Sequence, residues 1–429
     1  MNTTALLQLL HAEIMPAIGC TEPACVALCV ARAKEQLAAE PDAITVHLSK
    51  NIYKNAMAVG IPNTGLTGLP IAIALGATIG KSEYQLEVMR DTTPEAVDYA
   101  KRYLQRVNLQ ILVAPDAPDI LYVHTVVSLN NGASAEATIQ GTHTAFTSDK
   151  TPNDSIKEPT ANYKIQNLKE VYNFALEVPL SDVQFLMDGA KMNMAAAEKS
   201  FMGNYGHGLG RLLHTVSNQH LTNTQPTQMS NIFGDTLFTK ILCYTCGACD
   251  ARMSGAMVPV MSNSGSGNQG ISCSIPVYLY ALEHNFDEEI TLRALTLSNL
   301  TVIYMKQSLG RLSALCGCVV AATGSAAGLT YLMGGQYDEI TFAIKNMIAN
   351  ISGMICDGAK PACALKVTSG VATAVLSASM AMHHSFAEAT EGIVEDDIDR
   401  TIHNLTRIGH DGMCQTDDLI LDIMTHKQC

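Results

Sequence analysis

Residues 119–147 have the sequence DILYVHTVVSLNNGASAEATIQGTHTAFT, and this stretch decides the fold class of the chain. Asn131-Gly132 at its centre is a residue pair favoured in tight hairpin turns, and β-branched residues alternate with other residues on both sides. The pattern predicts an antiparallel β-hairpin. A helical pattern over residues 94–107 precedes the hairpin, so we expect residues 81–180 to form a small α+β insertion.

Helical patterns dominate the remainder of the chain. Residues 1–80 contain three of them, with a short alternating strand at Ile44–Leu48 between the second and the third. Residues 181–429 consist mainly of long stretches rich in Ala, Met, Leu and Gly. The sequence therefore predicts a mostly α (α+β) protein, in which a large helical domain built from residues 1–80 and 181–429 carries the insertion at 81–180. We expect the polar residues 148–166 to form a linker.

Composition and charge exclude several classes of protein. Hydrophobic residues make up 47% of the 429 residues and charged residues only 16%, which is enough apolar material for a large core. The formal net charge is −13 without a long Lys/Arg run, so we expect no nucleic-acid or membrane partner. Apolar runs such as Val319–Met333 are short and contain Thr, Ser and Tyr, which favours buried helices over membrane spans. The N-terminus has no signal-peptide pattern, so we expect a cytoplasmic protein.

The chain has thirteen cysteines, and in a reducing cytosol these are buried hydrophobic residues or metal ligands. Cys243, Cys246 and Cys249 have the two-residue gaps of a ferredoxin-type run, but no fourth cysteine followed by proline completes it. The segment has a helical pattern, and spacings of three place these cysteines on roughly one face. A buried helical face accepts cysteine readily, so we favour packing over cluster binding for this group.

Three other cysteines have less ordinary neighbours. Cys20 comes just before a predicted helix, where unpaired N–H groups and the helix dipole favour a thiolate. Cys316 lies in a Leu-Cys-Gly-Cys segment, and Cys356 lies in a loop that ends at Pro361. Iron–sulfur clusters need soft thiolate ligands, which can come from distant parts of a chain. Spacing alone does not select these three.

Five segments together resemble the L-cysteine desulfidase family, which is related to the α-subunit of the iron–sulfur L-serine dehydratases. The resemblance runs over nearly the whole chain. The segments are Gly19–Pro23 (GCTEP), Asp250–Gly255 (DARMSG), Gly265–Gly270 (GSGNQG), Leu312–Cys318 (LSALCGC) and Ile355–Lys360 (ICDGAK).

The resemblance implies a [4Fe–4S] cluster in which three cysteines hold three irons and the fourth iron is open to substrate. Carried over to the matching positions, the ligands are Cys20, Cys316 and Cys356. The implied reaction is β-elimination of L-cysteine to sulfide, pyruvate and ammonia. An L-serine dehydratase with the same cluster chemistry and a non-catalytic iron–sulfur sensor are the alternatives.

Three further cysteines leave the ligand set open. Cys318 lies two residues beyond Cys316 and can replace it, and Cys273 lies roughly where the serine dehydratases have a ligand. The C-terminal Cys429 corresponds to a residue that occupies the open iron in some related dehydratases, although an uninvolved terminus explains it as well.

The substrate carboxylate is expected at the polar, glycine-rich loop 262–270, which precedes a helix and offers exposed N–H groups to an anion. A phosphate site and a merely tight turn are the alternatives, and no Gly-Lys-Ser/Thr ending supports a nucleotide loop. The candidate side chains in this loop are those of Ser262, Ser264, Asn268 and Gln269.

Further candidates are charged or amide side chains near the motifs. Asn51, Lys54 and Asn55 share one face if their segment is helical, although a solvated helix start also explains them. Arg252 and Lys360 are candidate carboxylate partners, and Asp357 is a candidate for the substrate ammonium.

The general base is open from sequence. The candidates are Lys54, Lys360 and the histidines. His207 and His410 lie in loop settings that suit function slightly better, whereas a buried structural histidine explains His383-His384 better than catalysis does. No lysine has a recognisable pyridoxal-phosphate setting, and we expect a small amino acid as the partner and a homodimer as the assembly.

Overall fold

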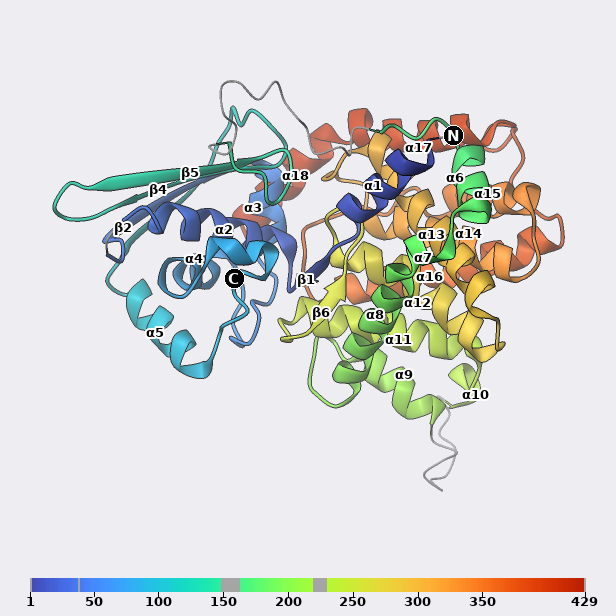
Figure 1. Ribbon diagram of the computed structural model, residues 1–429, viewed down its shortest axis with the longest axis horizontal. Coiled ribbons are helices and arrows are strands. Elements are labelled where there is room, and N and C mark those ends of the chain that lie inside the picture. The colour runs from blue at the N-terminus through green and yellow to red at the C-terminus, as the bar shows by residue number, and fades with distance from the viewer. Residues whose placement is uncertain (1, 38, 148–162, 219–229, 428–429) are drawn as a thin grey trace.

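The computed structural model describes residues 2–37, 39–147, 163–218 and 230–427. Two hydrophobic clusters divide the molecule into two lobes (Figure 1). The α+β lobe comprises residues 21–146, and the helical lobe comprises residues 3–18 together with residues 163–412. The mostly α, α+β fold class predicted from the sequence is confirmed.

One four-stranded sheet forms the framework of the α+β lobe, with strand order β3-β2-β4-β5. The hairpin is confirmed, because β4 and β5 pair antiparallel from Tyr122↔Gln140 to Ser128↔Ser134. β2 pairs in parallel with β3 and antiparallel with β4. The bounds are β2 (Ala43–Leu48), β3 (Asn108–Val113), β4 (Tyr122–Ser128) and β5 (Ser134–Gln140).

Helices cover one face of this sheet (Figure 1). α2 lies against β4 and β5 and is buried along nearly its whole length, because its side chains are mostly Ala, Val, Leu and Cys. α4 packs closely on α2 because Gly76 leaves room for the carbonyl of Ala27. The bounds are α2 (Thr21–Lys34), α3 (Lys50–Ala56), α4 (Leu69–Thr78), η1 (Ser82–Glu87) and α5 (Pro94–Leu104).

The helical lobe is built around α14, which is almost entirely buried and packs against α12, α13, α15 and α16. Gly324 and Gly328 let α14 approach the backbone of α13 closely. The bounds are α1 (Thr3–Glu13), α6 (Leu168–Glu177), α7 (Leu180–Val183), α8 (Phe185–Phe201), α9 (Leu209–Ser217), α10 (Ser230–Phe233), α11 (Leu237–Met253), α12 (Gly267–Glu283), α13 (Glu288–Leu309), α14 (Gly317–Leu332), α15 (Tyr337–Ile351), α16 (Cys363–Met382), α17 (Ile398–Arg407) and η4 (Ile408–Gly412).

Contrary to expectation, one described helix, α16, is long and apolar enough to cross a membrane by length and composition. Its most apolar stretch is 44% buried, and the helix packs against α11, α14 and α15. Core helices of globular proteins have the same composition. α16 is therefore weak support for a membrane span.

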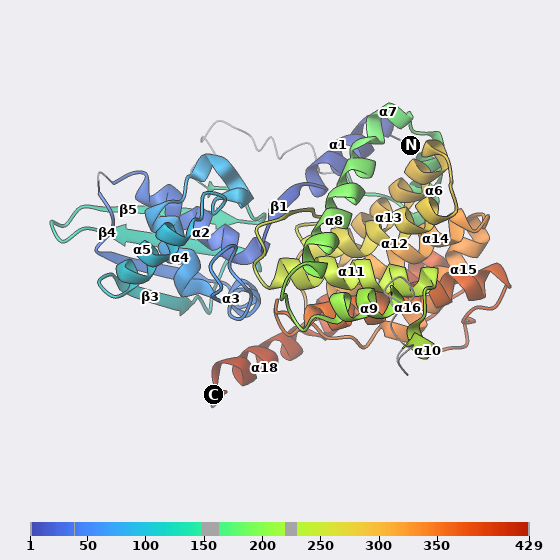
Figure 2. The ribbon, with the colours of Figure 1, turned by 90° about the horizontal axis from the view of Figure 1, so that it is seen from below.

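Several contacts join the lobes. β1 (Pro16–Ile18) pairs antiparallel with β6 (Pro259–Met261) within the helical lobe, and β1 also contacts η1 of the α+β lobe. The amide of Gly60 donates to the carbonyl of Met253 at 3.0 Å, at the end of α11. The C-terminal helix α18 (Cys414–Thr425) leaves the helical lobe and lies against α3 of the other lobe (Figures 1 and 2).

The lobe boundaries differ from the domain boundaries expected at residues 81 and 180. β2 is a central strand of the sheet, and α2 and α4 share its hydrophobic cluster, so most of residues 1–80 pack with the insertion. α6 packs in the helical lobe although it lies before residue 181. A central strand cannot leave its sheet, which is why the insertion begins near residue 21. Most of the expected linker 148–166 lies outside the described residues.

Candidate active site

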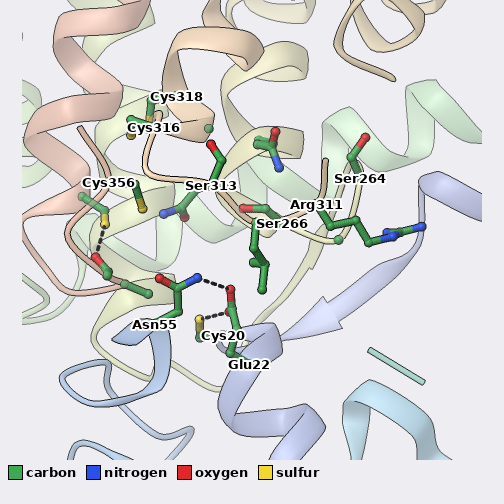
Figure 3. Close-up of a pocket in the computed structure, with 18 of the residues that line it drawn as sticks. Cys20, Glu22, Asn55, Ser264, Ser266, Arg311, Ser313, Cys316, Cys318 and Cys356 are labelled. Atoms are coloured by element: carbon green, nitrogen blue, oxygen red, sulfur yellow. Dashed lines mark hydrogen bonds between the residues drawn. The ribbon is translucent and has the colours of Figure 1, made fainter. Parts of the chain in front are cut away.

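A pocket between the two lobes brings together the three cysteines that were expected as ligands. Cys20, Cys316 and Cys356 all line it, and the cavity encloses about 720 Å³ of space, part of it open to solvent (Figure 3). The three thiols come from chain segments far apart in sequence, and the fold alone brings them to one pocket.

Backbone hydrogen bonds fix two of these cysteines relative to each other. The amide of Cys316 donates to the carbonyl of Met354 at 2.9 Å, and the amide of Cys356 donates to the carbonyl of Ala314 at 2.7 Å. Leu315 and Ile355 thus form an antiparallel bridge. The two loops behave as a short two-stranded unit, so the separation of the two thiols is set by backbone geometry.

Helix N-termini hold Cys20 and Cys316. Cys20 is the N-cap of α2, and Cys316 is the N-cap of α14. A hydrogen bond from the Cys318 thiol lowers the pKa of Cys316 to about 7. Burial, together with the negative charge of Glu22, raises the pKa of the Cys20 thiol, whose Sγ donates to Glu22 Oε2 at 2.9 Å. Thiolate formation at Cys316 is therefore favoured at neutral pH.

The remaining cysteines fall into two groups. Cys318 and Cys363 also line the pocket, so the choice between Cys318 and Cys316 stays open. Cys273 is fully buried in α12, where its Sγ lies 3.3 Å from Asn299 Oδ1, and it is not one of the lining residues. Cys429 lies outside the described residues.

The ferredoxin-like run does not contribute to the pocket wall. Cys243, Cys246 and Cys249 are buried in α11, as expected for packing residues, and Cys243 Sγ donates to the carbonyl of Gly210. Within the described ranges, no three or more His, Cys, Asp or Glu side chains are grouped to hold a metal ion.

The polar loop forms the opposite wall. Ser264, Asn268 and Gln269 line the pocket, whereas the hydroxyl of Ser262 donates to the carbonyl of Met15 and does not. The loop is held from both lobes, because Thr21 Oγ1 donates to the carbonyl of Gly265 at 2.9 Å. Gln269 Oε1 is buried and has no hydrogen-bond partner in the part of the chain that the structure describes.

Arg252 supplies a buried positive charge beside this loop. Its side chain is 2% exposed and lines the pocket, and Nη1 donates to Asn268 Oδ1 at 3.1 Å. Its Nε has no partner within the described residues. A buried guanidinium with an unpaired N–H group favours an anion as its partner.

On α3, the structure separates the candidates that the sequence grouped. Asn55 lines the pocket, and its Nδ2 donates to Glu22 Oε1 at 3.1 Å. Asn51 and Lys54 point elsewhere: both bind the carboxylate of Asp417 on α18. Lys54 also donates to the carbonyl of Cys356 at 3.3 Å.

Lys360 and Asp357 lie beside the pocket but do not line it. Lys360 Nζ is 2.5 Å from Asp357 Oδ1, and Lys366 binds the same carboxylate. Burial alone would raise the pKa of Asp357, but hydrogen bonds from the two lysines lower it to about 2. Both groups are thus already paired in the structure.

None of the four candidate histidines reaches the pocket wall, and His383, His384 and His410 are exposed. Sequence reasoning missed four charged or titratable side chains that do line it. These are Glu22, His143, Lys306 and Arg311.

The signals for these four residues were weak. Glu22 lies within the recognised Gly19–Pro23 motif. Lys306 is a single charge that directly follows the uncharged stretch Leu300–Met305. Either is detectable as a charge that burial would penalise. His143 follows the second strand of the hairpin in a Gly-Thr-His-Thr turn, which has no distinguishing pattern.

Comparison with known proteins identifies relatives over the whole chain. A family model described as serine dehydratase alpha chain matches residues 83–422, which include Cys316 and Cys356 but not Cys20. The UPF0597 proteins of Bacteroides fragilis and Phocaeicola vulgatus are each 54% identical to this chain, over 99% of it and 98% of their own lengths. The UPF0597 protein of Aeromonas hydrophila is 39% identical, over 99% of this chain and 97% of its own length.

Proposed function

The chain belongs to the serine dehydratase alpha-chain family, and from this premise we propose that it is an iron–sulfur lyase that converts L-cysteine to sulfide, pyruvate and ammonia. Family membership supports dehydratase-type elimination in general. The observation that carries the proposal is the convergence of three cysteines from distant segments on one pocket that is also lined by the buried Arg252.

The donor set fits an iron–sulfur cluster better than a single ion. Soft thiolates are the ligands that iron–sulfur clusters take, and three cysteines line this pocket. Cys20, Cys316 and Cys356 would hold it, and the lowered pKa of Cys316 at the N-terminus of α14 favours its thiolate. When bound, such a cluster supplies an iron that acts as a Lewis acid on the leaving group.

The other pocket residues account for the remaining needs of the reaction. Arg252 lines the pocket and its buried Nε has no partner among the described residues, so we assign Arg252 and the backbone of loop 262–270 to the substrate carboxylate. The substrate ammonium needs an acceptor, and Glu22 is the carboxylate that lines the pocket. Glu22 therefore takes the role that we expected for Asp357, whose charge the two lysines neutralise.

We also propose that the protein is located in the cytoplasm. All cysteines in the described residues carry free thiols, which fits a reducing, cytoplasmic compartment. We propose a homodimer, which light scattering after size-exclusion chromatography tests directly.

The decisive experiment is anaerobic purification with iron and sulfide analysis, followed by assays with L-cysteine and L-serine in parallel. About four irons per chain, with sulfide and pyruvate formed from L-cysteine, is the expected result. Pyruvate from L-serine alone would make the protein a serine dehydratase, the alternative that the name of the matching family favours. A protein that holds no iron after reconstitution and has neither activity would refute the proposal.

A further inference from the structure

His143 is a pocket residue that has no role in the proposed function as described so far. His143 lies in the loop after β5, its side chain is 5% exposed, and it lines the pocket. Its Nε2 is buried without a hydrogen-bond partner among the described residues. Buried imidazole nitrogens are normally paired, so an unpaired one in a residue that lines a pocket indicates a partner that comes with the ligand.

The backbone of the polar loop places this ring beside the carboxylate site. Gly265 has a φ of +79°, and a Cβ atom there would lie 3.0 Å from Cε1 and 3.1 Å from Nδ1 of His143. The ring therefore packs against the glycine of the loop to which we assign the substrate carboxylate. In an amino acid the carboxylate carbon is bonded directly to Cα, so a group beside the carboxylate site is within reach of the Cα proton.

The charges around His143 suit a group that accepts a proton. The pKa of His143 is lowered to about 4, mainly by burial. The positive charges of Arg311, Arg252 and Lys306 act in the same direction, whereas the negative charge of Glu22 opposes the shift. The imidazole is therefore neutral at pH 7 and has a free lone pair. The Glu22 carboxylate favours the imidazolium that forms once a proton has been accepted.

The other candidate bases are committed elsewhere. Lys54 binds Asp417, and Lys360 binds Asp357. Lys306 lines the pocket, but its Nζ donates to the carbonyl of Arg311 at 2.9 Å. Burial lowers the pKa of Lys306 only to about 8, so it is mainly protonated at neutral pH.

We propose that His143 Nε2 accepts the Cα proton of the substrate in the β-elimination, an inference that rests on the proposed function. The Cα–H bond breaks, its electron pair forms the Cα=Cβ double bond, and the leaving group departs from Cβ with the bonding pair. The proton on His143 then passes to the leaving group or to water, so the step is neutral in protons and electrons. His143 approaches from the α+β lobe, while Cys316 and Cys356 lie in the helical lobe.

The test replaces the imidazole without removing its polarity. His143→Gln is compared with His410→Gln, a matched control at an exposed histidine away from the pocket. We expect His143→Gln to keep its iron and its KM while kcat falls by about 10²- to 10⁴-fold. The deuterium isotope effect with Cα-deuterated substrate should increase, and imidazole should partly rescue His143→Ala.

A second variant displaces the ring rather than deleting it. Gly265→Ala places a methyl group against the His143 ring, and we expect a lower kcat with a larger isotope effect and unchanged iron. If His143→Gln does not fold, this variant decides the question.

Two results would overturn the inference. They are a kcat of His143→Gln within about threefold of the wild-type value, and a loss of activity in that variant that follows a loss of iron. Wild-type protein without iron or elimination activity refutes the proposed function instead, so the two failures are distinguishable.

Discussion

Replacing Lys54 with Met should loosen the loop that carries Cys356, because Lys54 holds that loop from the other lobe. The Lys54 side chain is 1% exposed, its Nζ forms an ion pair with Asp417 of α18, and it also donates to the carbonyl of Cys356. Gly358 lies directly against the backbone of Lys54. One buried cation thus connects α3, the C-terminal helix and the segment that follows a proposed cluster ligand.

The expected magnitude follows from the burial of the two partners. Removing one partner of a fully buried ion pair costs about 3–5 kcal/mol. Asp417 keeps 18% of its side chain exposed, so water solvates part of its charge, and Met retains the apolar contacts of the lysine stem. We therefore expect a loss of about 2–3 kcal/mol in local stability, which corresponds to about 30- to 150-fold faster exchange of protected amides.

Lys50 provides a matched control on the same helix. It pairs with Asp418 of α18 at 2.6 Å, but the two side chains are 44% and 58% exposed. Exposed pairs contribute at most about 1 kcal/mol, so Lys50→Met should change exchange by about fivefold or less. Hydrogen exchange of peptides covering residues 354–361 and 414–425 measures both variants. Equal effects of Lys50→Met and Lys54→Met would refute the reasoning that burial makes Lys54 the connecting residue.

Three further predictions concern the pocket. Cys316→Ala should abolish the visible thiolate-to-iron absorption of the reconstituted protein, while Cys243→Ala, whose thiol lies outside the pocket, should keep it. Arg252→Gln should raise KM about 10- to 100-fold, as expected for a lost charge-assisted hydrogen bond, with unchanged iron content. The kcat/KM of the wild type should stay level as pH falls through 6.5 and decrease only near pH 4, because protonation of His143, whose pKa is about 4, removes the base. A limb near pH 6.5, or the same low-pH limb in His143→Gln, would contradict this assignment.

Local sequence patterns predicted individual helices and strands better than they predicted how these elements assemble into the two lobes. The hairpin was predictable because Asn131-Gly132 sets the turn and the flanking alternation sets the register. The alternation of Ile44–Leu48 predicted a strand, but its partners lie in β3 and β4, more than 50 residues along the chain. Parallel pairing across a helical crossover leaves no local signal, so the sequence did not reveal that this strand is central.

The site residues also show this contrast between what the sequence indicates and what only contacts between distant segments reveal. Cys20, Cys316 and Cys356 came from a family resemblance, and the structure brings them to one pocket. Lys54 was one of several candidates for the general base, on a helix face that it was expected to share with Asn51 and Asn55. Its partner Asp417 is 363 residues away in sequence, and such an ion pair is invisible before the fold is known. His143 has no local pattern at all, and only its burial without a partner makes it a candidate.

The position of the pocket between the lobes couples cluster binding to lobe docking. Cys20 caps the first helix of the α+β lobe, whereas Cys316 and Cys356 belong to the helical lobe. A cluster held by all three bonds to both lobes, so it binds only the docked arrangement and stabilises that arrangement by its binding free energy. Without the cluster, docking depends on the contact of β1 with η1, the Gly60–Met253 hydrogen bond and the contacts of α18 with α3. The Lys54–Asp417 pair is one of these contacts and also binds the carbonyl of Cys356, so it fixes a ligand loop before any metal binds. This arrangement favours a preformed site, in which the thiol positions are set mainly by the protein backbone.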